Sequence, residues 1–157
     1  MSDPSGLRIL VLNGPNLNLL AERDPSLYGR TTLKEIEHQV TALGEELGVS
    51  VTCDQRNSEG EIVTLLQDSR TAYDGVVLNP GPLSHYSYAL RDVVDVISTP
   101  VVEVHISNIL AREAFRQTSV TSPAAQGVIC GCGAFGYELA LRAVLHRIAQ
   151  KQDPAVR

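Results

Sequence analysis

Five short apolar runs, rich in β-branched residues, recur along the chain, and a segment with helical spacing follows each of them. The runs cover residues 7–13, 49–54, 75–80, 100–107 and 127–131. Consecutive apolar positions, in place of strict alternation, are typical of strands that are covered on both faces. The alternation with helices predicts the order βαβαβαβαβα. We therefore expect an α/β fold, a flavodoxin-like three-layer sandwich with a five-stranded parallel sheet.

The clearest helical pattern covers residues 33–47. Its apolar stripe consists of Leu33, Ile36, Val40, Leu43 and Leu47. Thr32 and Glu35 have the spacing of a capping box, and Gly48 provides a stop signal. Further helices are expected over residues 58–72, 88–97, 109–115 and 134–150.

Length and composition indicate one globular domain over residues 1–157, with a frayed tail from about residue 150. The net charge of −5 argues against a nucleic-acid-binding surface. The first residues lack a signal peptide, and no apolar run approaches the roughly 20 residues of a membrane span. We therefore expect a cytoplasmic protein without a membrane partner.

Cys53, Cys130 and Cys132 are expected to be buried free thiols, with the last two on one strand face. We expect that they do not form a metal site.

Polar side chains cluster where the predicted strands end, which is the edge where open α/β sheets bind ligands. These residues are Asn13, Asn16, Arg23, Tyr28, Asn79, His85, Glu103, His105, Ser107, Arg112 and Arg116. Three of them are arginines, although the whole chain is acidic. The concentration of positive charge at one edge predicts an anionic small molecule as the ligand.

Glu103 and His105 lie two residues apart on a predicted strand, so their side chains share one face. The carboxylate would orient the imidazole and favour its protonated form, which makes His105 a candidate proton donor. An isolated Glu-x-His pair is more typical of a structural histidine at a strand end, and the polar residues gathered around His105 are what favour the proton donor.

Tyr28 follows Arg23 on the long polar segment after the first strand. A guanidinium at close range favours the phenolate, and a phenolate is a usable base. Without such a cation, Tyr28 would be a loop aromatic beside Gly29. Arg112 lies in the expected helix 109–115 and Arg116 directly follows it, so their i,i+4 spacing places them on one face, as either an anion site or a solvated basic face.

Six motifs in one order closely resemble the type II 3-dehydroquinate dehydratases. They are NGPNLNLL, ERDPSLYG, QRNSEGEIV, LNPGPLSHYSYALRD, EVHISNILAREAFRQTS and GYELALRAV, and they cover nearly the whole chain. The resemblance implies a flavodoxin-like subunit in a homododecamer, a tetramer of trimers. It also implies dehydration of 3-dehydroquinate to 3-dehydroshikimate through an enolate, without a cofactor or metal, in aromatic biosynthesis or in quinate breakdown.

The resemblance also implies roles for individual residues. Tyr28 would be the base, supported by Arg23, and His105 the general acid, oriented by Glu103. Asn16 would hold the water that hydrogen-bonds the enolate oxygen. The expected substrate-binding residues are Asn79, His85, Ile106, Ser107, Arg112 and Arg116, together with Asp92, which the family lends to a neighbouring subunit.

The segment from about residue 19 to 29 resembles the family's mobile lid. Asn13 is expected to tie down the turn after the first strand through its local backbone, and Asn18 to orient the loop. The chain departs from the family at Ala21 and Leu110, and together with Tyr86 these residues bear on turnover and inhibitor preference.

Other functions need features that this chain lacks. A Schiff-base dehydratase needs a lysine at a strand end, whereas the lysines are Lys34 and Lys151, on a helix face and in the tail. A phosphoacceptor receiver needs an aspartate where Asn79 stands. A flavin carrier needs hydroxyls in the loop after the first strand. An inactive relative that binds a small molecule stays open as an alternative.

Overall fold

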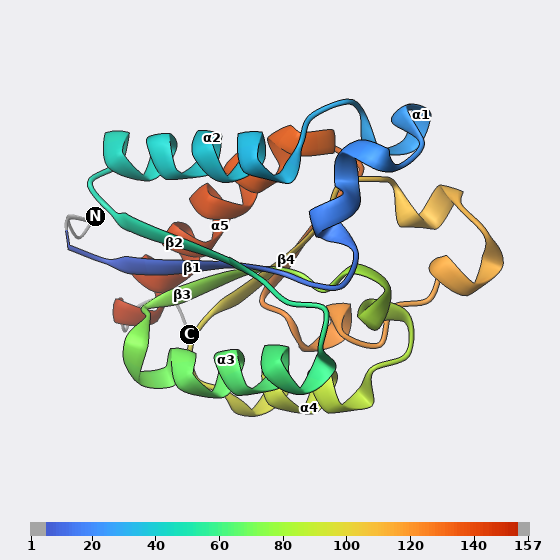
Figure 1. Ribbon diagram of the computed structural model, residues 1–157. Helices are drawn as coiled ribbons and strands as arrows, with labels where there is room; N and C mark the ends of the chain where they lie inside the picture. Colours follow the sequence, from blue (N-terminus) through green and yellow to red (C-terminus); the bar gives the residue numbers. More distant parts are fainter. Residues whose placement is uncertain (1–5, 154–157) are drawn as a thin grey trace.

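The fold is built on a five-stranded, all-parallel sheet with the strand order β2-β1-β3-β4-β5, seen in the computed structural model of residues 6–153 (Figure 1). The strands are β1 (Arg8–Asn13), β2 (Ser50–Gln55), β3 (Gly75–Asn79), β4 (Val101–His105) and β5 (Gly127–Cys130). Each lies within a residue or two of a predicted run. The predicted α/β fold with a parallel sheet is therefore confirmed.

The sheet order reverses between β1 and β3, because the chain first adds β2 on one side of β1 and then returns to add β3 on the other. In open parallel sheets, such a reversal leaves a crevice at the carboxyl ends of the two strands. Asn13 and Asn79 are the paired last residues of β1 and β3 at this point. Both therefore stand at the expected ligand-binding edge.

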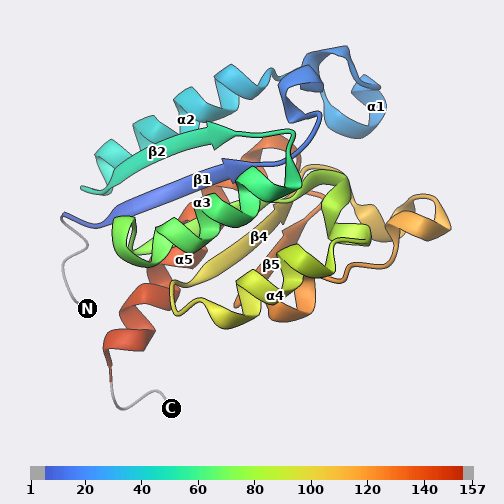
Figure 2. The same cartoon turned by 60° about the horizontal axis from the view of Figure 1, so that its bottom comes forward.

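Helices cover both faces of the sheet (Figure 2). The long helices are α2 (Leu33–Glu46), α3 (Glu59–Ala72), α4 (Tyr88–Val96) and α5 (Gly136–Gln152). Val11 packs in the cluster beneath α2 and α5, whereas its neighbours Leu10 and Leu12 pack in the cluster beneath α3 and α4. Successive residues of β1 thus fill two opposite cores, which is why the strand is apolar at consecutive positions.

Local capping signals set where the long helices begin. The Thr32 hydroxyl accepts from the Glu35 N–H, and the Glu35 carboxylate accepts from the Thr32 N–H at 2.6 Å, which completes the predicted capping box. The Ser58 hydroxyl caps α3 in the same way, by accepting from the Glu61 N–H. Helix α2 ends before Gly48, whose φ of 73° suits glycine.

The predicted helix over residues 109–115 is wrong. This segment forms two short 3-10 helices, η3 (Ile109–Ala111) and η4 (Ala114–Arg116), and Arg112 between them is extended, with φ −106° and ψ −164°. A segment this short does not recover the cost of helix nucleation, and the Asn108 side chain caps Leu110 locally instead. Arg112 and Arg116 therefore do not share a helix face.

Two smaller predictions also need correction. All three cysteines are free, but Cys53 and Cys130 are only partly buried and Cys132 is exposed beyond the end of β5, so the last two do not share a strand face. Helix α5 continues to Gln152, past the expected start of the frayed tail; the end of that tail, 154–157, lies outside the described residues.

Between residues 6 and 153, no helix has the length and apolar character to cross a membrane.

Candidate active site

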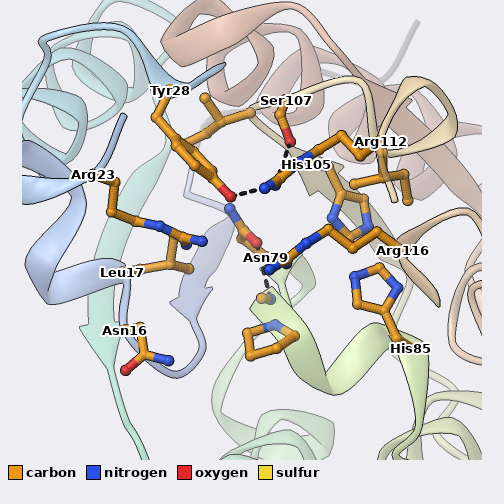
Figure 3. Close-up of a pocket in the computed structure, with 14 residues that line it drawn as sticks. Asn16, Leu17, Arg23, Tyr28, Asn79, His85, His105, Ser107, Arg112 and Arg116 are labelled. Atoms are coloured by element: carbon orange, nitrogen blue, oxygen red, sulfur yellow. Dashed lines mark hydrogen bonds between the residues drawn. The ribbon is translucent and has the colours of Figure 1, made fainter. Parts of the chain in front are cut away.

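A pocket of about 550 Å³, including its open mouth, lies at the carboxyl edge of the sheet (Figure 3). Most of the predicted site residues line it: Asn16, Arg23, Tyr28, Asn79, His85, His105, Ile106, Ser107, Arg112 and Arg116. Glu103 lies behind His105, where it is 1% exposed. Asp92 is exposed on α4 and does not line the pocket of its own chain. The structure thus brings together the predicted residues from the segments after β1, β3 and β4.

The turn after β1 forms one wall of the pocket. The Gly14 N–H donates to the Asn79 carbonyl at 2.8 Å, and a Cβ on Gly14 would lie 2.5 Å from the Pro80 carbonyl oxygen, so only glycine fits there. Asn16 adopts a left-handed conformation with φ 68°, which asparagine tolerates better than most residues. The turn presents Asn16, exposed, at the rim of the pocket.

The prediction that Asn13 bonds its local backbone is wrong. Its side chain instead contacts helix α5. The Tyr137 hydroxyl donates to Asn13 Oδ1 at 2.6 Å and accepts from Asn79 Nδ2 at 2.8 Å. Asn79 Oδ1 in turn accepts from the Gly81 N–H at 3.1 Å. Burial raises the pKa of Tyr137, so its phenol stays neutral and keeps the proton that it donates. This buried cluster fixes the Asn79 carboxamide with its nitrogen towards Tyr137 and its oxygen towards the Gly81 N–H.

Two guanidinium groups flank the Tyr28 ring, which belongs to the short helix α1 (Pro25–Tyr28). Arg112 Nη1 donates a short hydrogen bond to the Tyr28 hydroxyl (Figure 3). Arg23 lies over the ring face, with its guanidinium carbon 4.0 Å from the ring centroid. Sequence reasoning named Arg23 as the cation beside the phenol; the hydrogen-bond donor to the phenol oxygen is instead Arg112. The guanidinium carbon of Arg112 also lies 5.2 Å from the centroid of the Tyr28 ring.

His105 and Glu103 form the predicted pair at the end of β4. His105 Nε2 lies 2.6 Å from Glu103 Oε1, and the two side chains are 5% and 1% exposed. Because a carboxylate only accepts, Nε2 carries the proton and Nδ1 is left for the pocket. The serine hydroxyl of Ser122, which sequence reasoning missed, donates to the same Glu103 oxygen at 2.7 Å.

The opposite wall of the pocket carries His85 and Arg116. His85 Nδ1 lies 2.8 Å from the Thr118 carbonyl oxygen, so Nδ1 donates and a neutral imidazole keeps Nε2 as an acceptor. Arg116 Nε lies 3.1 Å from Glu113 Oε2, an ion pair whose geometry falls short of a hydrogen bond. A hydrogen bond with its own backbone, together with the charges of Arg112 and Arg116, holds the pKa of Glu113 below its usual range.

The arrangement suits proton transfer on an anionic substrate. A phenol under two positive charges and an imidazole under one carboxylate both point into the same pocket (Figure 3). Three arginines supply the positive charge that an anion needs. Within the described part of the chain, no group of three or more histidine, cysteine or carboxylate residues is arranged to hold a metal ion.

The sequence did not identify two residues of the site, Tyr137 and Ser122, and it did not reveal the contact between Arg112 and Tyr28. Tyr137 lies inside a helical pattern, where an aromatic residue reads as core. Ser122 belongs to the hydroxyl-rich stretch of residues 118–122, which was the one signal available. The contact between Arg112 and Tyr28 joins residues 84 positions apart, and no local pattern reports it.

The chain is similar to known proteins over nearly its whole length. A family model described as Dehydroquinase class II matches residues 7–145. The 3-dehydroquinate dehydratase of Pelotomaculum thermopropionicum is 56% identical over 137 residues, which cover 87% of this chain and 95% of the relative. The type II dehydroquinase of Propionibacterium acnes, known from a crystal structure, has a TM-score of 0.86 and 42% identity, covering 90% of this chain and 98% of that one. The chain therefore belongs to the class II dehydroquinase family.

Proposed function

We propose that this protein is a 3-dehydroquinate dehydratase, which eliminates water from 3-dehydroquinate to give 3-dehydroshikimate. The observation that carries the proposal is the pairing of Tyr28, under two guanidinium groups, with the buried His105–Glu103 pair in one pocket. The names of relatives such as that of Pelotomaculum thermopropionicum support the choice of substrate. Protein side chains carry out the proposed reaction without a cofactor.

The first step is removal of the C2 proton, next to the ketone, by the Tyr28 phenolate. The hydrogen bond from Arg112 and the Arg23 charge above the ring stabilise this phenolate between turnovers. The C2 electron pair moves into the ketone and forms an enolate, and Tyr28 becomes a neutral phenol. Tyr28 passes that proton to solvent before the next cycle.

The enolate oxygen needs a hydrogen-bond donor in place before charge develops on it. Asn16 stands at the rim of the pocket, and its left-handed backbone is held by the hydrogen bond from its own N–H to Asn57 Oδ1 at 3.1 Å. Its carboxamide holds a water molecule against the enolate oxygen. A neutral donor fixed in advance lowers the cost of the enolate without a large rearrangement.

The second step is loss of the C1 hydroxyl. His105, with Nε2 bonded to Glu103, donates a proton from Nδ1 to the leaving oxygen. The enolate electrons re-form the ketone, the C1–C2 double bond forms, and water departs. The ionised Glu103 balances the positive charge of the imidazolium before the transfer. Base and acid thus come from different segments and act on different atoms.

Polar groups around the pocket hold the substrate in this orientation. The backbone at Ile106 and Ser107 receives the substrate carboxylate, and the Ser107 hydroxyl lies 3.4 Å from Arg112 Nη1. His85 Nε2 accepts from a ring hydroxyl, since Nδ1 is committed to the Thr118 carbonyl. Arg116 and Asn79 bind the other ring oxygens. These contacts turn the C2 proton towards Tyr28 and the C1 hydroxyl towards His105.

The segment of residues 19–29 acts as a lid over the bound substrate. It contains the end of the 3-10 helix η1 (Leu17–Glu22) and all of α1, and its residue Arg23 packs on Tyr28. The Arg112–Tyr28 hydrogen bond joins the lid to the segment after β4. Opening the lid breaks this bond and lets the product leave.

The active assembly is a homododecamer, a tetramer of trimers, in which Asp92 reaches the site of a neighbouring subunit. Exposed apolar side chains support a subunit contact along α4 and β5: Tyr88 is 69% exposed, Val96 79% and Val128 46%. Asp92 lies on the same helix and away from its own pocket. Mixing inactive Asp92→Ala and Tyr28→Phe proteins through denaturation and refolding then restores part of the activity. Restoration requires a site that combines Tyr28 and Asp92 from different chains.

The reaction is tested by the rise in ultraviolet absorbance of the conjugated enone when purified protein meets 3-dehydroquinate. The assay is repeated with a chelator and after borohydride treatment in the presence of substrate. Full activity under both conditions supports direct acid–base chemistry, and loss after borohydride contradicts it. No activity from the intact assembly overturns the proposal and favours an inactive binding protein. The same step serves aromatic biosynthesis and quinate breakdown, so this assay does not distinguish the two pathways. The cytoplasmic location of the protein stays a prediction.

A further inference from the structure

The carboxylate that orients the catalytic acid is itself held through one oxygen. Glu103 Oε1 accepts from His105 Nε2 at 2.6 Å and from Ser122 Oγ at 2.7 Å. Glu103 Oε2 is buried and has no hydrogen-bond partner within residues 6–153. A buried carboxylate depends on the few donors that it has, because no water replaces a lost one. Among the residues that the structure describes, Glu103 has two such donors, and Ser122 is one of them.

Counting protons gives this hydroxyl chain a direction. Ser122 has one hydroxyl proton, and the carboxylate can only accept, so this proton points to Glu103. The Ser119 hydroxyl, 2.8 Å from Ser122 Oγ, therefore donates to Ser122. The Ser122 backbone N–H donates back to Ser119 Oγ at 3.0 Å, which holds the two serines together. Ser119 thus donates to Ser122, and Ser122 and His105 both donate to the same oxygen of Glu103.

The segment that carries these serines is anchored on the elements around the site. The Val120 N–H donates to the Ser84 carbonyl at 2.7 Å, and Arg91 Nη1 donates to the Val120 carbonyl at 3.1 Å. Ser122 opens the 3-10 helix η5 (Ser122–Ala124), which contacts α4. Ser122 does not line the pocket, so it reaches the reaction only through Glu103.

We propose that Ser122 is a positioning residue for the catalytic acid, which acts by fixing the Glu103 carboxylate in its ionised form against His105. The proposal rests on the proposed dehydratase function. Without the serine hydroxyl, His105 is the one donor left to this buried carboxylate within residues 6–153, and the proton between the two shifts towards Glu103. The imidazole is then neutral and keeps only its Nδ1 proton, and a neutral imidazole is a far weaker acid than an imidazolium, so it protonates the leaving hydroxyl more slowly. Removal of the C2 proton by Tyr28 does not depend on this pair.

The test uses Ser122→Ala in the full-length protein and measures two rates. Elimination is followed by enone absorbance, and exchange of the C2 proton with deuterated water is followed by proton NMR. We expect kcat for elimination to fall by about tenfold, the effect of one hydrogen bond to a charged group. The KM and the exchange rate stay within about twofold of the wild-type values. Ser122→Thr, which keeps the hydroxyl, restores elimination.

Ser69→Ala is the control, because the buried Ser69 hydroxyl likewise donates one short hydrogen bond, to the Leu66 carbonyl at 2.6 Å, far from the pocket. Equal loss of exchange and elimination in Ser122→Ala, or the same kcat loss in Ser69→Ala, overturns the positioning role. If Ser122→Ala does not fold, Ser119→Ala decides: a weaker loss confined to elimination supports the proposal, and unchanged rates refute it. Absence of dehydration by the wild-type protein would refute the proposed function instead.

Discussion

Tyr137→Phe tests whether the buried tyrosine holds the ends of β1 and β3 together. The substitution keeps the ring, which is 1% exposed, and removes only the hydroxyl. That hydroxyl donates to Asn13 Oδ1 at 2.6 Å and accepts from Asn79 Nδ2 at 2.8 Å. Asn13 is 0% and Asn79 3% exposed, so neither group gains water when its partner is lost.

The expected loss follows from these two orphaned groups. Leaving one buried donor or acceptor unsatisfied costs about 1–3 kcal/mol, so the pair costs roughly 2–6 kcal/mol of the free energy of unfolding. Asn13 Nδ2 already lacks a hydrogen-bond partner in the described part of the chain, so the carboxamide has no second contact to fall back on. For a domain of this size, the loss corresponds to a Tm lower by roughly 4–24 °C.

The assay is thermal unfolding followed by circular dichroism at one fixed protein concentration, so that assembly contributes equally to both proteins. Tyr73→Phe is the control, because Tyr73 is partly buried and makes no side-chain hydrogen bond within residues 6–153. Its Tm should stay within about 2 °C of the wild type. A Tm for Tyr137→Phe that matches the Tyr73→Phe control would refute the reasoning.

Four further outcomes follow from the structure, two at the site and two at the cysteines. Tyr28→Phe lowers kcat by about 10²-fold or more while substrate still binds, as measured by calorimetry; near-normal turnover would remove Tyr28 as the base. Arg112→Ala lowers kcat by about 10- to 100-fold because the phenol loses its hydrogen-bond donor, and an unchanged kcat would contradict this. Burial raises the pKa of Cys53 to about 11, so Ellman's reagent at pH 8 modifies exposed Cys132 first, and similar rates would contradict it. Because the folded chain keeps the Cys53 proton to higher pH than the unfolded chain, stability declines as pH rises from about 9 towards 11.

Features with local signals could be predicted from the sequence. Helix α2 carries its stripe, its cap residues Thr32 and Glu35, and its stop at Gly48 within one short segment. The pairing of Glu103 with His105 follows from strand alternation alone, since residues two apart on a strand share a face. The order of strands and helices likewise follows from the apolar runs.

Contacts that depend on docking of distant segments could not be predicted in this way. Asn13 meets Tyr137 across 124 positions, and its environment is set by how α5 packs on the sheet. The segment of residues 109–115 has a helical pattern, but its backbone extends at Arg112, whose side chain meets Tyr28. Ser122 sits in a stretch without periodicity, and its role depends on the fold that brings it to Glu103.

The central claim is that Tyr28 and His105 carry out separate steps on one substrate. Proton NMR of 3-dehydroquinate in deuterated water, with Tyr28→Phe and His105→Ala proteins, measures both steps in one sample. We predict that His105→Ala exchanges the C2 proton while the signal of the enone product stays low, and that Tyr28→Phe does neither. Exchange by Tyr28→Phe at the wild-type rate, or loss of exchange and elimination in equal measure by His105→Ala, would contradict the account.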